Sequence, residues 1–391
     1  MTTQILTGYS QMCLLRCIEM ERCGMSSKSK VVVAMSGGVD SCVAACLLKE
    51  QGYDVVGVTM KLWDDNSETG SINVKGCCTL EDVEDARRVC QIIGIPHYVM
   101  NFQREFKENV IDYFIDEYKK GRTPHPCLAC NDKIKFDFLL NRAKYLGVDY
   151  VATGHYARLN NDGGSPILRM GVDDTKDQSY VLFNLKPDQS QSLILPIGGY
   201  TKQEIRQIAR DYGLPVADKV DSQEICFIPM NDYRSFIAER TEAVPGEIID
   251  KTGNLIGKHD GIENFTIGQR RGLGINSSEP LFVTSILRNT HQVVVGSSKD
   301  LLQTVLWASN VNYISGFVPE TEINISAKIR YKSSLSPAVL IPHGDWAEIK
   351  FSEPQRAITP GQAVVFYLGD TVLGGGYIES TESVPEFVGT L

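Results

Sequence analysis

Apolar residues in the first half of the chain alternate between strand-like and helix-like patterns. Strands are predicted at 31–33, 54–60, 97–101 and 150–153, and helices at 42–51, 79–93, 106–119, 131–146 and 202–212. A Ser-Gly-Gly turn separates the first strand from the first helix. Strands alternating with helices are typical of βαβ units. The pattern therefore predicts an α/β domain built on a doubly wound parallel sheet.

The pattern changes after residue 229. Two strand-like stretches, 167–170 and 180–183, still flank a polar loop in the first part. Beyond it, residues 233–288 are Gly-rich and mixed, and from 292 short strands follow one another at turn-punctuated spacing, as in a compact β-barrel. We expect an extension without fixed structure (1–29), a catalytic domain (30–228), a small central domain (229–291) and a C-terminal barrel (292–391).

Charge and composition narrow the class of protein. The 391 residues carry 39 basic and 48 acidic side chains, a formal charge of −9, which argues against a surface that binds nucleic acid nonspecifically. A local basic stretch, 119–135, could still dock an RNA backbone or be a solvated loop. Eleven cysteines without an evident signal peptide or membrane segment suggest a reducing, cytoplasmic location.

The strongest motif is Ser36-Gly37-Gly38-Val39-Asp40-Ser41, between a hydrophobic strand and a helix. Glycines let the backbone approach an anion closely, and the helix start offers unpaired N–H groups and the positive end of its dipole. The motif lacks the Lys-Ser/Thr ending of a Walker loop and the spacing of a dinucleotide fingerprint. It predicts a phosphate cradle of another kind.

Two cysteines lie in settings that predict different thiol reactivity. Cys130 follows a Pro-bounded loop and is expected to open a helix at Asn131, where the helix dipole with Lys133 and Lys135 would favour the thiolate. Cys226 lies in an apolar stretch, 224–228, and on its own has the pattern of a buried core thiol.

The hexapeptide resembles the PP-loop of ATP pyrophosphatases. From about residue 30 onward the chain resembles one branch of that superfamily, the tRNA-specific 2-thiouridylases. The matching stretches are 34–41, 57–63, 130–136, 152–156, 176–180, 222–228 and 266–274. The resemblance implies a transferase that binds ATP and tRNA.

The resemblance also assigns residues. It implies that ATP is held by Ala34, Met35, Ser36, Gly37, Gly38, Val39, Asp40 and Ser41, with Met60 on the adenine side, Gly154 where backbone meets nucleotide, and Mg²⁺ on the pyrophosphate. It implies that His125, Pro126 and Cys127 approach the extruded target base, consistent with chemistry on a base hidden in a stacked loop. It implies tRNA contacts by His155, Lys176, Asp177, Gln178, Arg330, Tyr331 and Gln362.

In that family, the cysteine matching Cys226 carries a persulfide received from a sulfur-donor or relay protein, and the one matching Cys130 is the nucleophile. The implied reaction is adenylation of the C2 oxygen of the wobble uridine, followed by sulfur transfer to give 2-thiouridine, AMP and pyrophosphate. Cys127 departs from the family pattern, which usually has Asp there. Cys127, Cys130 and Cys226 could therefore hold an iron–sulfur cluster, [4Fe-4S], with one open iron; the alternatives are a persulfide-only route and a coincidental cysteine.

Two other functions compete with this one. A PP-loop ligase that adenylates a small molecule would need neither Cys130 nor Cys226. A noncatalytic metal- or RNA-binding protein would use the cysteines as ligands and would not need an intact nucleotide loop.

Overall fold

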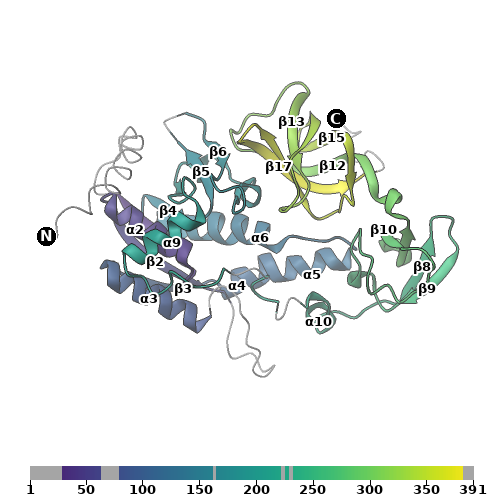
Figure 1. The fold of residues 1–391 in the computed structure, drawn as a ribbon, viewed down its shortest axis with the longest axis horizontal. Helices are drawn as coiled ribbons and strands as arrows, with labels where there is room; N and C mark the ends of the chain where they lie inside the picture. The colour runs from purple at the N-terminus through teal and green to yellow at the C-terminus, as the bar shows by residue number, and fades with distance from the viewer. Residues whose placement is uncertain (1–28, 63–78, 162–163, 222–224, 229–231, 382–391) are drawn as a thin grey trace.

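The computed structural model describes residues 29–62, 79–161, 164–221, 225–228 and 232–381, so the extension expected at 1–29 lies almost entirely outside the described residues. The described chain forms a parallel sheet, a small four-stranded sheet and a larger sheet that closes into a barrel (Figure 1). These are the three regions that the change of pattern predicted. None of the helices in the described part of the chain is long and apolar enough to cross a membrane.

The parallel sheet positions the phosphate loop. Its order is β3 (His97–Asn101), β2 (Asp54–Lys61), β1 (Lys30–Ala34), β4 (Tyr150–Thr153) and β7 (Leu193–Ile194), with every neighbouring pair parallel. Strand order reverses beside β1, because β2 and β4 flank it on opposite sides. In doubly wound sheets ligands bind where the connections diverge at such a point, outside the carboxyl ends of the strands.

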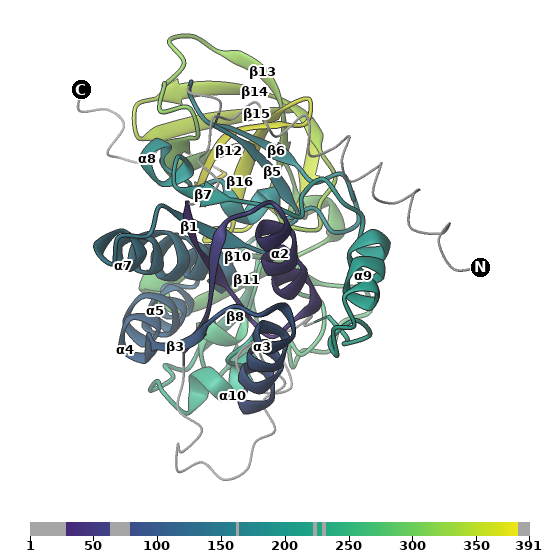
Figure 2. The ribbon, with the colours of Figure 1, turned by 90° about the vertical axis from the view of Figure 1, so that its left-hand side faces the viewer.

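Alternating side chains of β1 serve two hydrophobic cores. Val31 and Val33 pack with helices α2 (Val39–Glu50), α3 (Leu80–Ile93) and α9 (Lys202–Asp211), whereas Val32 and Ala34 face the opposite layer. That layer holds α4 (Gln103–Phe106), a π-helical turn (Lys107–Ile111), α5 (Asp112–Lys119), α6 (Pro126–Ala129), a π-helical segment (Cys130–Leu139) and α7 (Leu140–Tyr145). Figure 2 shows the two helix layers on either side of β1. The doubly wound prediction is confirmed.

Two element predictions were wrong. The helix predicted at 131–146 begins at Pro126 instead of Asn131. Proline suits the first helical position, because it has no N–H to leave unpaired and its φ matches that of a helix. Residues 179–182 form a 3₁₀ turn rather than a strand. The buried Asp177 carboxylate accepts hydrogen bonds from the backbone N–H and the hydroxyl of Ser179, which bends the chain there.

The barrel contains β12 (Leu302–Tyr313), β13 (Ile323–Lys328), β14 (Ser336–His343), β15 (Trp346–Arg356), β16 (Ala363–Leu368) and β17 (Thr371–Ser380). Pairing of β12 with β17 closes it. A hairpin from the catalytic domain, β5 (Ala157–Asn160) and β6 (Ile167–Met170), continues the same sheet beyond β17. The catalytic domain and the barrel are therefore hydrogen-bonded into one sheet, which the sequence pattern did not predict.

The central region comprises α10 (Tyr233–Ala238) and a sheet in the order β10 (Phe282–Leu287), β11 (Gln292–Gly296), β8 (Gly246–Asp250) and β9 (Leu255–His259). The sequence pattern grouped 292–296 with the barrel. In the structure β11 pairs with β10 and β8 instead. Short helix α8 (Pro187–Ser190) precedes β7.

Candidate active site

The phosphate loop connects β1 to the first turn of α2. The Met35 N–H still bonds the Val58 carbonyl oxygen at 2.8 Å, and the chain then turns at Gly37, whose φ is +72°. The Ser41 hydroxyl accepts from the Ser36 N–H at 3.2 Å and donates to the Gly38 carbonyl oxygen at 3.1 Å. Within the described part of the chain, no side chain caps α2, whose N-cap is Gly38. An uncapped helix start of this kind suits an anion. Phosphate binding by the loop remains a prediction.

Close backbone packing fixes this loop from two sides. A Cβ on Gly37 would overlap the Asp82 backbone carbonyl in the first turn of α3. A Cβ on Gly154, at the end of β4, would lie 2.6 Å from the Ser41 nitrogen and 2.7 Å from the Asp40 carbonyl carbon. Gly154 thus packs directly against the backbone at the start of α2. Its contact with the nucleotide remains a prediction.

Side chains far along the sequence from the loop fix it through ion pairs and hydrogen bonds. The Lys219 ammonium donates to the Gly37 carbonyl oxygen at 3.2 Å and to Asp82 and Asp85 at 2.7 and 2.6 Å. The Asp40 carboxylate accepts from the Tyr156 hydroxyl at 2.7 Å and from Lys202. Burial and the adjacent Asp40 charge raise the pKa of Tyr156 far above its usual value, so its hydroxyl remains a donor.

Met60 lies at the carboxyl end of β2, next to β1. Its side chain is buried in the core layer shared with α5 and the helix that begins at Pro126. The structure therefore places it at the same sheet edge as the loop. Its assignment to the adenine side remains a prediction.

The thiol region lies at the start of the helix that runs from Pro126 to Tyr145. Cys127 is exposed in its first turn, whereas Cys130 lies one turn further on, half-buried at the start of the π-helical segment. The helix-dipole argument made for Cys130 applies better to Cys127, because the effect falls off within the first turn. Lys133 is ion-paired with Asp132 and Asp137, both at 3.2 Å, so its charge is already compensated.

Three rings surround the helix start. The centroids of His125, Tyr180 and Tyr331 are 6.1 to 6.4 Å from one another. Burial lowers the pKa of His125, and its Nδ1 is buried without a hydrogen-bond partner among the described residues. Burial, together with nearby Asp177 and Cys127, raises the pKa of Tyr331 to about 12. The structure thus brings together His125, Cys127 and Tyr331, which the resemblance assigned to the target base and the tRNA.

Cys226 lies on a short described segment, 225–228, and is half-buried. Phe227 anchors the segment, with ring centroids 5.5 Å from Phe114 and 5.4 Å from Phe236. Cys130 and Cys226 both border the hydrophobic core that contains these rings. Two cysteines separated by 96 positions are therefore packed on the same core.

The other residues assigned to tRNA already have partners in the protein. Lys176 pairs with Asp221 at 2.7 Å, and Gln178 accepts from the Tyr156 N–H at 2.9 Å. His155 is buried, with Nδ1 2.6 Å from the Thr153 hydroxyl. Arg330 donates to the Ala357 carbonyl oxygen and to Thr359, and Gln362 donates to the Thr123 carbonyl oxygen at 2.8 Å. These side chains therefore have structural contacts within the protein, and their assignment to tRNA remains a prediction.

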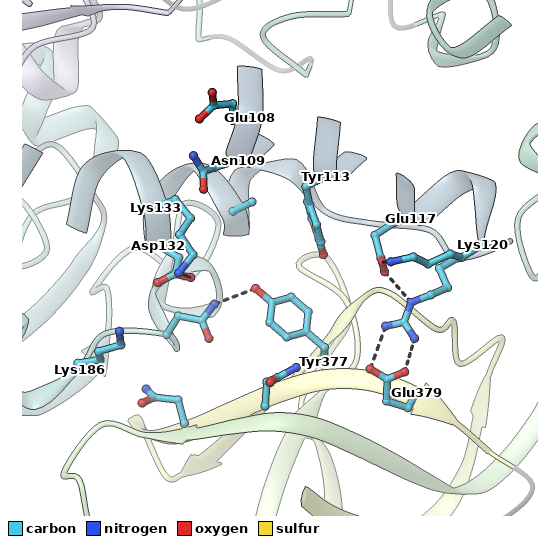
Figure 3. Close-up of a pocket in the computed structure, with 15 residues that line it drawn as sticks. Glu108, Asn109, Tyr113, Glu117, Lys120, Asp132, Lys133, Lys186, Tyr377 and Glu379 are labelled. Atoms are coloured by element: carbon cyan, nitrogen blue, oxygen red, sulfur yellow. Dashed lines mark hydrogen bonds and ion pairs between the residues drawn. The ribbon is translucent and has the colours of Figure 1, made fainter. Parts of the chain in front are cut away.

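A cavity of about 720 Å³ lies between α5, the π-helical segment and the barrel (Figure 3). It takes in much of the basic stretch 119–135, but Lys120 pairs with Glu117 at 2.9 Å and Arg122 bridges Glu117 and Glu379. Cations and carboxylates balance among its lining residues. The balance favours the solvated interpretation of the basic stretch over an RNA groove, and no lining residue belongs to the phosphate loop.

The three candidate cluster ligands are not gathered. Across the described ranges, which include all three cysteines, no group of three or more His, Cys, Asp or Glu side chains is arranged to hold a metal ion. The residues as placed do not fit an iron–sulfur cluster.

Sequence reasoning missed Tyr156, Lys202 and Lys219, which hold the phosphate loop. Lys202 is 162 positions from Asp40 and Lys219 is 182 positions from Gly37. The only available signal was that 152–156 and 176–180 match the family, which marked the neighbourhood of Tyr156 without giving its partner.

Comparisons with known proteins agree with this architecture. Family models match residues 29–230 (tRNA methyl transferase HUP domain), 234–297 (tRNA methyl transferase PRC-barrel domain) and 303–378 (Aminomethyltransferase beta-barrel domain). A tRNA-specific 2-thiouridylase MnmA from Carboxydothermus hydrogenoformans is 52% identical over 90% of this chain and 98% of its own length. The enzyme of that name from Clostridium perfringens is 51% identical over 90% of this chain and 99% of its own. The chain belongs to the family of tRNA-specific 2-thiouridylases, which confirms the resemblance seen in its motifs.

Proposed function

We propose that this protein is an ATP-dependent transferase that converts a tRNA uridine, the wobble uridine, to 2-thiouridine. The observation that carries the proposal is the pairing of two features in one domain: an uncapped phosphate loop after β1, and Cys130 and Cys226 on one core. A ligase of small molecules would need only the first. A noncatalytic RNA- or metal-binding protein would need neither the open helix start nor the loop's close packing.

The phosphate loop would bind ATP so that the uridine C2 oxygen attacks the α-phosphorus and pyrophosphate leaves. Adenylation is needed because oxide is a very poor leaving group, whereas AMP leaves readily. Mg²⁺, a hard cation, would be held chiefly by phosphate oxygens and would neutralise the pyrophosphate. Backbone N–H groups of Val39, Asp40 and Ser41 would stabilise the phosphate charge.

Sulfur transfer would require a different role from each of the two cysteines, a sulfur carrier and a thiolate that releases the product. The terminal sulfur of a Cys226 persulfide, supplied by a donor protein, attacks C2 and displaces AMP. The Cys130 thiolate then attacks the Cys226 sulfur, which releases 2-thiouridine and leaves a Cys130–Cys226 disulfide that an external thiol reduces. No step passes through an iron–sulfur cluster, because the three cysteines are not gathered.

Cysteine variants test this assignment. Thiolation of unmodified tRNA with ATP and a sulfur source should be lost in Cys130→Ser and Cys226→Ser and retained in Cys127→Ser. Cys46→Ala is the control, because Cys46 is buried in the opposite core, one helical turn beyond Cys42, and alanine adds no polar group there. Iron is measured on anaerobically purified protein. Loss of activity and iron together in Cys127→Ser would contradict the persulfide route in favour of a cluster.

A further inference from the structure

A buried ammonium group links the phosphate loop to a second carboxylate. Lys202 Nζ lies 2.7 and 2.9 Å from the two oxygens of Asp40 and 2.8 Å from Asp221 Oδ1. Only 11% of the Lys202 side chain is exposed. One cation thus pairs with a carboxylate inside the phosphate loop and with one outside it.

The Asp221 carboxylate forms ion pairs with two further cationic side chains. Asp221 also accepts from Lys176 at 2.7 Å and from Arg206 at 3.1 Å. Burial opposes ionisation of Asp221, but hydrogen bonds from Lys176 and Lys202 hold its pKa below the usual value. Three cations thus face the carboxylates of Asp40 and Asp221, and each of these cations is fixed by an ion pair.

The start of α9 positions the Lys202 ammonium beside Asp40. It is the first residue of α9, after the Thr201–Glu204 capping box, and its N–H donates to Asp173 at 2.9 Å. Its ammonium lies 5.7 Å from the centroid of the Tyr156 ring, whose hydroxyl donates to the same oxygen of Asp40. Two elements therefore fix one carboxylate rotamer.

We propose that Lys202 is a positioning residue of the ATP site, which orients the Asp40 carboxylate in the phosphate loop and is itself held in place by Asp221. Without the ammonium, the Asp40 carboxylate would repel incoming phosphates and its rotamer would be held by Tyr156 alone. The idea rests on the proposed function for its catalytic consequence, but not for its effect on ATP binding.

The test compares Lys202→Met, which keeps length without charge, with Lys202→Arg, which keeps the charge. Lys251→Met is the control, because Lys251 forms an exposed ion pair with Asp300 in the central sheet. ATP affinity is measured by equilibrium binding, and KM and kcat by tRNA-dependent AMP release. Lys202→Met should raise both the Kd and the KM for ATP about tenfold with a smaller change in kcat, while Lys202→Arg should recover most of the affinity.

The same contact is tested from its other side by Asp221→Asn, which also serves if Lys202→Met does not fold. Asp221→Asn should weaken ATP binding severalfold, because Lys202 loses one of the two carboxylates that hold its ammonium in place. Unchanged ATP affinity in the folded variant of either position would overturn the proposal, as would parallel losses explained by a lower melting temperature alone. Wild-type protein that binds ATP but makes no 2-thiouridine would refute the proposed function, and the binding comparison would still decide the role of Lys202.

Discussion

Lys328 of the barrel forms an ion pair at 3.6 Å with Asp177 of the catalytic domain, and both side chains are largely buried. The remaining acceptor positions of Asp177 are taken by Gly171 and Ser179. The family resemblance assigned this aspartate to tRNA binding. In the structure it joins the catalytic domain to the barrel, so its first role is to hold the two in register.

Removing the Asp177 charge should therefore destabilise the fold. Asp177→Asn leaves the buried Lys328 ammonium without its carboxylate, a change that costs about 3 kcal/mol when one partner of a buried pair is lost. Thermal unfolding should show a midpoint lower by several degrees. Asp174→Asn, on the exposed part of the same loop, is the control and should have no effect. A normal midpoint with weakened tRNA binding would instead support the direct-contact role.

Gly37 should be the most sensitive glycine of the phosphate loop. Gly37→Ala places a Cβ against the Asp82 backbone and strains a φ of +72°. ATP affinity should fall by at least about tenfold, because the loop must shift to relieve the overlap. Gly52→Ala is the matched control: φ is +90° there but nothing lies within 4 Å. Equal ATP affinity in the two variants would contradict the need for glycine at position 37.

Thiol reactivity should separate the cysteines into two groups. Burial raises the pKa of Cys90 to about 11 and of Cys46 to about 12, and raises that of Cys42 further. These thiols are protonated and inaccessible at neutral pH, so iodoacetamide should modify them only after unfolding. Among the six cysteines that the structure describes, Cys127, which is exposed at a helix start, should react first. Peptide mass spectrometry over a time course measures the order, and early labelling of Cys46 would contradict the buried core.

His155 predicts a dependence of stability on pH. Burial, and then the Lys135 charge, hold its pKa well below the usual 6.5. Because Lys135 can only donate, Nε2 must accept and Nδ1 must carry the proton shared with Thr153. Stability is full above about pH 6.5 and is lost as the pH falls, since only the unfolded chain takes up the proton readily.

The check compares thermal midpoints between about pH 7.5 and 5.5. The wild-type midpoint should fall more steeply than that of His155→Gln, while His343→Gln should keep the wild-type slope. Identical slopes for wild type and His155→Gln would show that His155 is not the group responsible.

The sequence predicted those features that depend on neighbouring residues. The run 31–33 followed by Gly37 and Gly38 was enough for a strand, a phosphate loop and a helix, and the strand at 97–101 was predicted with the bounds that the structure gives. Pairings over long distances were not readable. The β6–β17 junction joins segments two hundred residues apart, and neither short strand carries a mark of its partner.

In the candidate site, too, the sequence predicted local features but not contacts between distant residues. Cys130 was singled out by its setting and Cys226 only by the family resemblance. The start of the helix at Pro126 then moved the dipole argument from Cys130 to Cys127. The partners of Asp40 and Asp177 come from α9 and the barrel, and no local pattern encodes them. Charges that look basic along the chain, as at Lys120 and Arg122, proved to be paired in space.

A single-turnover reaction tests the central claim most directly. Protein carrying a persulfide on Cys226 is mixed with ATP and unmodified tRNA in the absence of added thiol, and nucleosides, AMP and protein disulfides are measured together. The account predicts one 2-thiouridine and one AMP for each persulfide consumed, with a Cys130–Cys226 disulfide left on the protein. AMP release without 2-thiouridine, or 2-thiouridine formed in Cys130→Ser at the wild-type rate, would contradict it.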